Sequence, residues 1–130
     1  LIIDAANASN KYSKHQQLRD NGIEVKVENY AGKMHAKTMI IDEKYVVIGS
    51  MNFSRSGEEK NDENTVILDN PQIAKFLIKQ FNIIWEKIPN KYLKYNVPAE
   101  SRESIGSCYD GVDNNFDGKI DGLDKNCQKK

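Results

Sequence analysis

A short run in the first third of the chain, His35-Ala-Lys37-Thr-Met-Ile-Ile-Asp42, constrains the fold most strongly. Its apolar and β-branched residues predict a strand over residues 34–42. Because side chains alternate along a strand, His35 and Lys37 are expected to point to the same face. An imidazole beside a fixed cation suits a phosphate, since the cation meets the charge on the non-bridging oxygens. Gly49-Ser50 and Asn52 follow soon afterwards.

The remaining pattern predicts an α/β protein with a mixed sheet flanked by helices. A short helix is expected over residues 12–21, stopped by Gly22. A longer helix is expected from Pro71, with Asn70 as its N-cap. Its apolar stripe is expected to pack on the sheet and consists of Ile73, Phe76, Leu77, Phe81, Ile84, Trp85 and Ile88. Strands are predicted over residues 1–4, 23–27 (half-buried), 34–42, 45–48 and 65–68, and a polar loop over residues 49–64.

The spacing H-x-K-x4-D-x6-G-S-x-N resembles the signature of the phospholipase D superfamily at every defined position. The Asn-x-Glu-Asn segment at residues 61–64 is similar to the region after the signature in the compact, bacterial-nuclease-like branch. The similarity covers residues 1–88, which we expect to form one phospholipase D-like half. Residues 89–107 are interpreted as a linker, and residues 108–127 as a separate small module.

The resemblance implies a role for each polar residue of the signature. His35 would be the nucleophile or general acid of a two-step exchange through a phosphohistidine. Lys37 and Asn52 would hold the phosphate oxygens, with the Ser50 hydroxyl close behind. Glu63 would orient the imidazole through its other nitrogen. On chemistry alone, three neighbouring carboxylates compete with Glu63 for that role: Glu58, Glu59 and Asp62.

Two further residues receive weaker assignments. Asp42 belongs to the signature, but its parity differs from that of His35, so we expect it to point away or to lie at the turn. There it would support the fold through hydrogen bonds without touching the substrate. His15 matches no motif and is interpreted as a solvated histidine on the first helix.

The active site of this superfamily is built from two such signatures, and the chain contains one. Two arrangements are open: a second copy in sequence before Leu1, or two identical chains about a two-fold axis. The first is favoured, because Leu1 opens part-way into a strand. An isolated monomer is expected to be nearly inert.

Within the small module, residues 113–124 fit a twelve-residue calcium loop of the EF-hand type, with Gly118 at the sharp turn. Cys108 and Cys127 bracket the loop, and a disulfide is their natural use, with a reduced pair in the cytoplasm as the alternative. The stretch resembles Cys-flanked repeats appended to extracytoplasmic bacterial proteins, which implies an extracytoplasmic location and a structural, non-catalytic ion. An acidic disordered tail is the alternative. The predicted Ca²⁺ ligands are Asp113, Asn115, Asp117, Lys119 (through its carbonyl), Asp121 and Asp124.

The sequence therefore predicts a hydrolase that cleaves phosphodiesters, with a nucleic acid as the favoured substrate. A phospholipase D or phosphatidyltransferase acting on phospholipids is the alternative, and a non-catalytic calcium-binding module is a third hypothesis. The chain has 19 basic and 19 acidic residues, so no overall field favours a polyanion. No apolar run approaches the roughly 18–20 residues of a membrane span.

Overall fold

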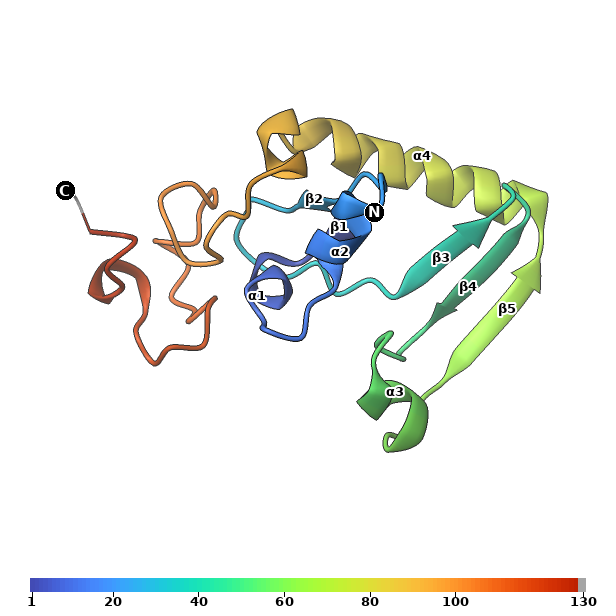
Figure 1. Ribbon diagram of the computed structural model, residues 1–130, viewed down its shortest axis with the longest axis horizontal. Helices are drawn as coiled ribbons and strands as arrows, with labels where there is room; N and C mark the ends of the chain where they lie inside the picture. Colours follow the sequence, from blue (N-terminus) through green and yellow to red (C-terminus); the bar gives the residue numbers. More distant parts are fainter. Residues whose placement is uncertain (129–130) are drawn as a thin grey trace. The chain divides into compact units, whose positions relative to one another are not determined.

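The computed structural model describes residues 1–128, drawn in Figure 1. These residues form two compact units. The first unit joins Leu1–Met34 to the C-terminal residues from Lys87 onward, and the second is His35–Glu86. Every residue that the signature assigns to the phosphate site belongs to the second unit.

The first unit contains a small parallel sheet and four short helices. Asp4 caps the first helix by accepting a hydrogen bond from the Asn7 N–H at 3.0 Å. Gly22, with a φ of 81°, follows the second helix, as the sequence predicts. The predicted helix over residues 12–21 is shorter in the structure. The elements are β1 (Ile2–Ile3), α1 (Ala5–Ala8), α2 (His15–Asp20), β2 (Lys26–Val27), η1 (Asn90–Leu93) and η2 (Asp121–Leu123).

The prediction of a half-buried strand over residues 23–27 is wrong, because both faces of β2 are covered. Lys26 is only 2% exposed and donates from Nζ to the Ile88 carbonyl at 2.7 Å. Glu28 is only 1% exposed and accepts a hydrogen bond from the Ala5 N–H at 3.0 Å. Burial raises the pKa of this carboxyl group to about 7. Lys26 and Glu28 are thus part of the interior, whereas Glu24, which precedes β2, is exposed.

His15 is also buried, at 7% exposure, so the interpretation as a solvated histidine is wrong. Its Nδ1 lies 2.8 Å from the Ser13 hydroxyl, and its Nε2 lies 2.9 Å from the Asn96 side-chain nitrogen. Arg19 donates to the Asn96 side-chain oxygen at 2.9 Å, which orients that amide. Burial, with Arg19 as a second cause, lowers the pKa of His15. The histidine is a structural link between α2 and the segment after η1.

The segment interpreted as a linker packs within the first unit. Tyr30 and Ile105 form a parallel bridge, and the Ala31 N–H donates to the Ile105 carbonyl at 2.7 Å. Lys33 lies over the Phe116 ring at 3.9 Å. The boundaries at residues 1–88, 89–107 and 108–127 stay a prediction, and the compact units divide the chain differently.

The second unit is an antiparallel sheet in the order β3-β4-β5, followed by a long helix. Val47 of the central strand pairs with Met39 on one side and Ile67 on the other. The Asn70 side chain accepts hydrogen bonds from the N–H groups of residues 72 and 73, so the predicted N-cap is confirmed. The polar loop after β4 contains a short helix that the sequence did not predict. The elements are β3 (Thr38–Ile41), β4 (Tyr45–Gly49), α3 (Arg55–Glu59), β5 (Thr65–Asp69) and α4 (Pro71–Lys87).

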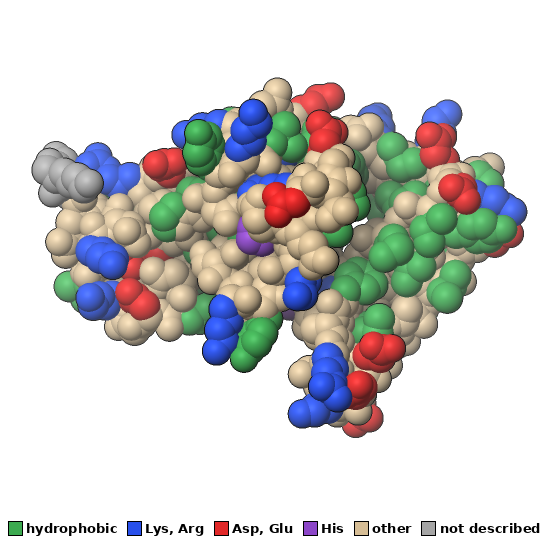
Figure 2. Space-filling model, viewed as in Figure 1, with side chains coloured by type: hydrophobic (Ala, Val, Ile, Leu, Met, Phe, Trp, Pro, Cys, Tyr) green, Lys and Arg blue, Asp and Glu red, His purple; other side chains and the backbone are tan. Residues whose placement is uncertain are grey.

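Burial of the α4 stripe is only partial. Phe76 remains 61% exposed, whereas Ala74 is fully buried, and Phe81 stacks with Trp85 at a centroid distance of 5.6 Å. Figure 2 shows hydrophobic side chains gathered over the three-stranded sheet. The exposed apolar residues of the sheet are Met39, Ile41, Tyr45, Ile48, Val66 and Ile67.

Among residues 1–128, no helix has both the length and the apolar character needed to cross a bilayer.

Candidate phosphate site

His35 and Lys37 lie in the segment that leads into β3. The Gly49 N–H donates to the Lys37 carbonyl at 3.3 Å, so the pairing of β3 with β4 extends back to Lys37. The assigned strand begins later than predicted, at Thr38, because β4 ends at Gly49 and offers no partner to earlier residues. The imidazole of His35 is exposed and Lys37 is half-buried, with its Nζ donating to the His35 carbonyl at 2.8 Å.

The end of β4 and the start of β5 approach each other very closely at Gly49. A Cβ at this position would lie 2.0 Å from the Asn64 carbonyl oxygen, so only glycine fits. The approach lets the Ser50 N–H donate to that same carbonyl at 2.9 Å. The Asn64 N–H in turn donates to the Ser50 hydroxyl oxygen at 3.0 Å. The Gly-Ser pair therefore fixes the Ser50 side chain at this end of the sheet.

Glu63 accepts one hydrogen bond on each carboxylate oxygen. The Ser50 hydroxyl donates to Oε2 at 2.5 Å, and the Asn61 side-chain amide donates to Oε1 at 3.0 Å. The pKa of Glu63 is lowered, first by Ser50, then by Asn61, and least by the positive charge of Lys37. The structure thus brings Lys37, Ser50 and Glu63 together and adds Asn61.

The expected contact between Glu63 and the imidazole is not formed. Among residues 1–128, the His35 ring makes no hydrogen bond, ion pair or ring contact. Both oxygens of Glu63 are already engaged by Ser50 and Asn61. The role of Glu63 in orienting the imidazole therefore stays a prediction.

Asn52 is exposed, and its backbone is packed against α3. A Cβ on Gly57 would lie 2.3 Å from the Asn52 carbonyl oxygen, so the helix can approach only because residue 57 is glycine. Ser54 caps α3 by accepting a hydrogen bond from the Gly57 N–H at 3.2 Å. A serine followed by a short polar run is an N-cap signal, and it could have revealed α3 in the sequence.

Asp42 lies at the turn between β3 and β4, where the sequence placed it. It is exposed and adopts a φ of 53°, as does Glu43. The Lys44 N–H closes the turn by donating to the Ile41 carbonyl at 3.1 Å. The side chain of Asp42 makes no hydrogen bond or ion pair with the part of the chain that the structure describes. Its place in the signature therefore corresponds to a hairpin turn and not to the cluster around Glu63.

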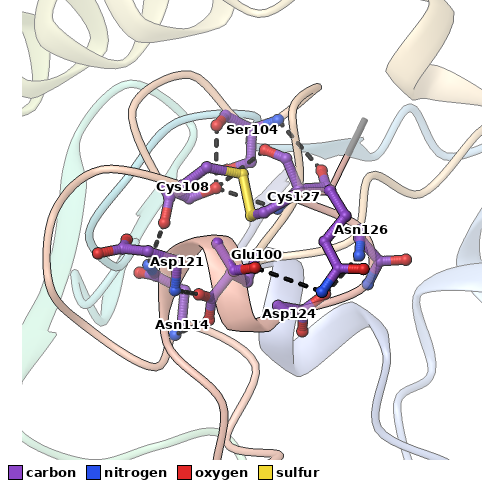
Figure 3. Close-up of a disulfide and its surroundings, with 12 residues drawn as sticks. Glu100, Ser104, Cys108, Asn114, Asp121, Asp124, Asn126 and Cys127 are labelled. Carbon is purple, nitrogen blue, oxygen red and sulfur yellow. Dashed lines mark hydrogen bonds between the residues drawn. A yellow bond between two sulfur atoms is a disulfide. The ribbon is translucent and has the colours of Figure 1, made fainter. Parts of the chain in front are cut away.

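The predicted disulfide between Cys108 and Cys127 is present, with a Cα–Cα distance of 5.5 Å. Glu100 precedes the disulfide-closed loop and is fully buried, although no sequence motif marks it. It accepts hydrogen bonds from the backbone N–H groups of Asn114 and Asp121, as Figure 3 shows. Burial raises the pKa of Glu100. This carboxyl group ties the segment before the loop to the loop itself.

The carboxylates of the predicted calcium loop are turned towards the loop's own backbone. Asp113 accepts hydrogen bonds from the N–H groups of Asp117 and Gly118, and the Asn115 amide donates to Asp124 at 2.7 Å. Within residues 1–128, no three His, Cys, Asp or Glu side chains gather to hold a metal ion. The loop carboxylates thus accept hydrogen bonds from within the loop, and Gly118 has the expected sharp turn, with a φ of 87°.

Comparisons with known proteins match the chain from Leu1 to near the end of α4. Residues 1–85 match the family model described as "Cardiolipin synthase, PLD-like domain". The solved structure of Nuc from Salmonella typhimurium, described as a phospholipase D family member, superposes with a TM-score of 0.64 at 26% identity. The superposition covers 68% of this chain and 60% of that one. The mixed α/β fold predicted from the sequence is thereby confirmed.

Curated relatives match over a similar region. The phospholipase D of Rickettsia conorii is 31% identical over 81 residues, which is 62% of this chain and 40% of that protein. The human mitochondrial cardiolipin hydrolase is 32% identical over 92 residues, which is 70% of this chain and 35% of that protein. The chain thus spans well under half the length of these relatives. Residues beyond the matched region, including the tail, gain no support from them.

Proposed function

Because this chain belongs to the phospholipase D-like family, we propose that it is a phosphodiesterase in which His35 acts on the phosphorus atom. One observation carries the proposal: the residues of the signature around Lys37, Ser50 and Glu63 form a single hydrogen-bonded and electrostatic cluster. The exposed imidazole of His35 precedes Lys37 by two positions. A cation, a hydroxyl group and an exposed imidazole at one end of a sheet are suited to a phosphate diester.

The reaction proceeds in two displacements. In the first, a nitrogen of His35 attacks phosphorus, an N–P bond forms, and the bond to the leaving oxygen breaks. The leaving oxygen takes a proton from a second histidine acting as general acid. In the second, water attacks phosphorus, that second histidine accepts the proton of the water, and the N–P bond breaks. Lys37 and Asn52 hold the non-bridging oxygens throughout, which stabilises the charge that develops on them.

The second histidine comes from a second copy of the signature. Either another segment of a longer polypeptide or a second identical chain supplies it, since His15 of this chain is buried and structural. A two-fold axis would bring two His35 side chains to one phosphate.

A nucleic acid is the favoured substrate, as the sequence of the loop after the signature indicates. The exposure of His35 and Asn52 supports this choice, because a polymeric phosphodiester reaches an open surface without entering a pocket. A phospholipid is the second candidate, favoured by the names of the relatives, phospholipase D and cardiolipin hydrolase. Transfer of the phosphatidyl group to an alcohol belongs to the same alternative.

Incubation with plasmid DNA and, separately, with phosphatidylcholine and cardiolipin vesicles tests the proposal. Wild type, His35→Ala and the control Lys60→Ala are compared, since Lys60 is an exposed lysine of the same unit outside the signature. We expect cleavage of DNA by wild type and the control, and a loss of about a thousandfold or more in His35→Ala. Cleavage of vesicles alone would select the phospholipid. Equal activity of His35→Ala would remove the proposal.

Mixing experiments test the need for a second copy. When wild type is co-refolded with an equal amount of His35→Ala, a site shared by two chains retains about a quarter of the activity, because only pairs of wild-type chains are complete. A site within one chain retains about half. The full-length polypeptide with both signatures on one chain would follow the second pattern.

For the tail, we propose an extracytoplasmic location and a structural calcium ion, both as separate hypotheses. The Cys108–Cys127 disulfide supports the first, since such bonds persist in oxidising compartments. The loop spacing supports the second, whereas the side-chain directions described above do not. Calorimetric titration with calcium, before and after reduction, tests it, and the absence of heat in both states would eliminate calcium binding.

A further inference from the structure

We propose that Asn61 is a positioning residue of this site, because its side-chain amide holds the Glu63 carboxylate in a fixed orientation. The catalytic consequence rests on the proposed function, whereas the contact itself does not. Neither the signature nor the family match assigns a role to Asn61.

The geometry of the carboxylate shows why a second donor is needed. The terminal torsion of a glutamate side chain is broad, so a single hydrogen bond leaves the carboxylate free to turn. The Ser50 hydroxyl holds Oε2 at 2.5 Å, and Asn61 holds Oε1 at 3.0 Å. With one donor on each oxygen, any rotation of the group loses both bonds. The pair of contacts therefore fixes the plane of the carboxylate as well as its place.

Asn61 can serve this role because its own backbone is fixed. Its N–H donates to the Ser56 carbonyl of α3 at 3.0 Å. The same helix packs against the Asn52 carbonyl through Gly57, where no larger residue fits. Helix α3 thus connects the residue expected to hold the phosphate with the residue that holds Glu63. The loop after β4 is a support for the site and not a free connection.

The chemistry of an amide donor is also suitable. A neutral N–H group favours the ionised carboxylate without neutralising it, whereas a second lysine would compete with Lys37 for the substrate. Glu63 then stays an acceptor for the imidazole N–H of the active assembly. The hydrogen bond from Asn61 is the second-largest cause that lowers the pKa of Glu63, after that from Ser50.

A side-chain carbon-13 NMR titration of Glu63 tests the contact without any assay of activity. Asn61→Leu has a similar shape and charge but no donor, and Asn61→Gln restores the amide. Asn82→Leu is the matched control, because Asn82 is an exposed asparagine on α4. We expect the pKa of Glu63 to rise in Asn61→Leu, to return towards the wild-type value in Asn61→Gln, and to stay unchanged in Asn82→Leu. A pKa in Asn61→Leu equal to that of wild type would overturn the inference.

The pH profile of the assembled enzyme tests the catalytic consequence. In Asn61→Leu we expect kcat to fall about tenfold with little change in KM, and the acid limb of the profile to move to higher pH. A shifted pKa with an unchanged kcat and profile would refute the positioning role and leave the phosphodiesterase intact. A wild-type protein that cleaves no phosphodiester, with the pKa shift present, would refute the proposed function and retain only the contact.

Discussion

The two units of this protein treat their ionisable groups in opposite ways. In the first unit, Lys26, Glu28 and His15 are buried, and each is bound to a neighbouring backbone or side-chain group. In the second unit, His35 is exposed, and the half-buried Lys37 acts electrostatically on Glu63, which is hydrogen-bonded to Ser50. The comparison teaches that burial here marks structural roles, whereas exposure combined with fixed geometry marks the candidate site.

The largest expected effect comes from one substitution made in both units. Lys37→Met should lower phosphodiesterase activity by a hundredfold or more, about the loss on removing one charge-stabilising group, with the free energy of unfolding nearly unchanged. Lys26→Met should instead lower the free energy of unfolding and leave the phosphodiesterase activity of the folded protein nearly unchanged. It leaves the Ile88 carbonyl without its donor and should cost about 1–3 kcal/mol of stability. Urea unfolding and plasmid cleavage measure the two effects. If Lys37→Met destabilises the protein as much as Lys26→Met, the comparison fails.

Next in size is the loss of the disulfide. Replacing both Cys108 and Cys127 by serine opens a loop with a sequence separation of 19 and should cost about 3 kcal/mol by the chain-entropy model. Because Ile105 pairs with residues 29–31 in the same unit, amide exchange should quicken there as well as in the tail. Exchange measured by mass spectrometry checks this. Protection that is unchanged at residues 29–31 would show that the tail does not support that segment.

A third prediction concerns pH. The pKa of Glu28 is raised to about 7 in the folded protein from an ordinary 4.5. The protonated form is favoured by folding, so this stabilisation is complete below about pH 4.5 and is lost as the pH rises to about 7. Glu28→Gln should therefore stabilise the protein by about 2 kcal/mol at pH 8 and destabilise it by about 1 kcal/mol at pH 4, because its unpaired amide hydrogens cost about 1 kcal/mol at both pH values. Denaturant midpoints at the two pH values decide it, and equal effects at both would contradict the buried-acid account.

The smallest expected effect concerns the two histidines and how His15 responds to pH. Burial lowers the pKa of His15, so its contribution to stability is present above about pH 6.5 and is lost on acidification. A proton NMR titration should show the His15 ring titrating below its ordinary value of 6.5. Asn96→Ala should disturb the His15 signal and leave that of His35 in place, because the Asn96 amide lies against the His15 ring. A His15 midpoint at or above the ordinary value would be the opposite result.

The second unit was largely predictable from the sequence, and the first was not. Regular alternation and the cap at Asn70 predicted β3, β4, β5 and the start of α4, since these depend on local chemistry. The signature indicated Lys37 and Ser50, and the resemblance of residues 61–64 to the bacterial-nuclease-like branch selected Glu63. The first unit depends on distant pairings that no local pattern encodes. His15 meets a residue far along the chain, and Lys26 meets the carbonyl of Ile88.

The site shows the same limit on a smaller scale. The sequence indicated Asn61 only as part of the Asn-x-Glu-Asn segment. Its contact with Glu63 depends on the fold of the segment that contains α3, which was predicted to be a polar loop. The imidazole of His35 makes no hydrogen bond or ion pair among residues 1–128, so the role of Glu63 in orienting it stays a prediction. Glu100 carries no motif, and its burial depends on how the tail closes around it.

The central claim is that His35 forms the bond to phosphorus, and acid-free quenching followed by peptide mass spectrometry measures it directly. The chain has two histidines, so the position of an adduct is unambiguous. With a slowly hydrolysed phosphodiester and the complete assembly, we predict a phosphoramidate on the peptide containing His35 and none in His35→Ala. An adduct on the His15 peptide, or rapid cleavage with no adduct at any time point, would contradict the account.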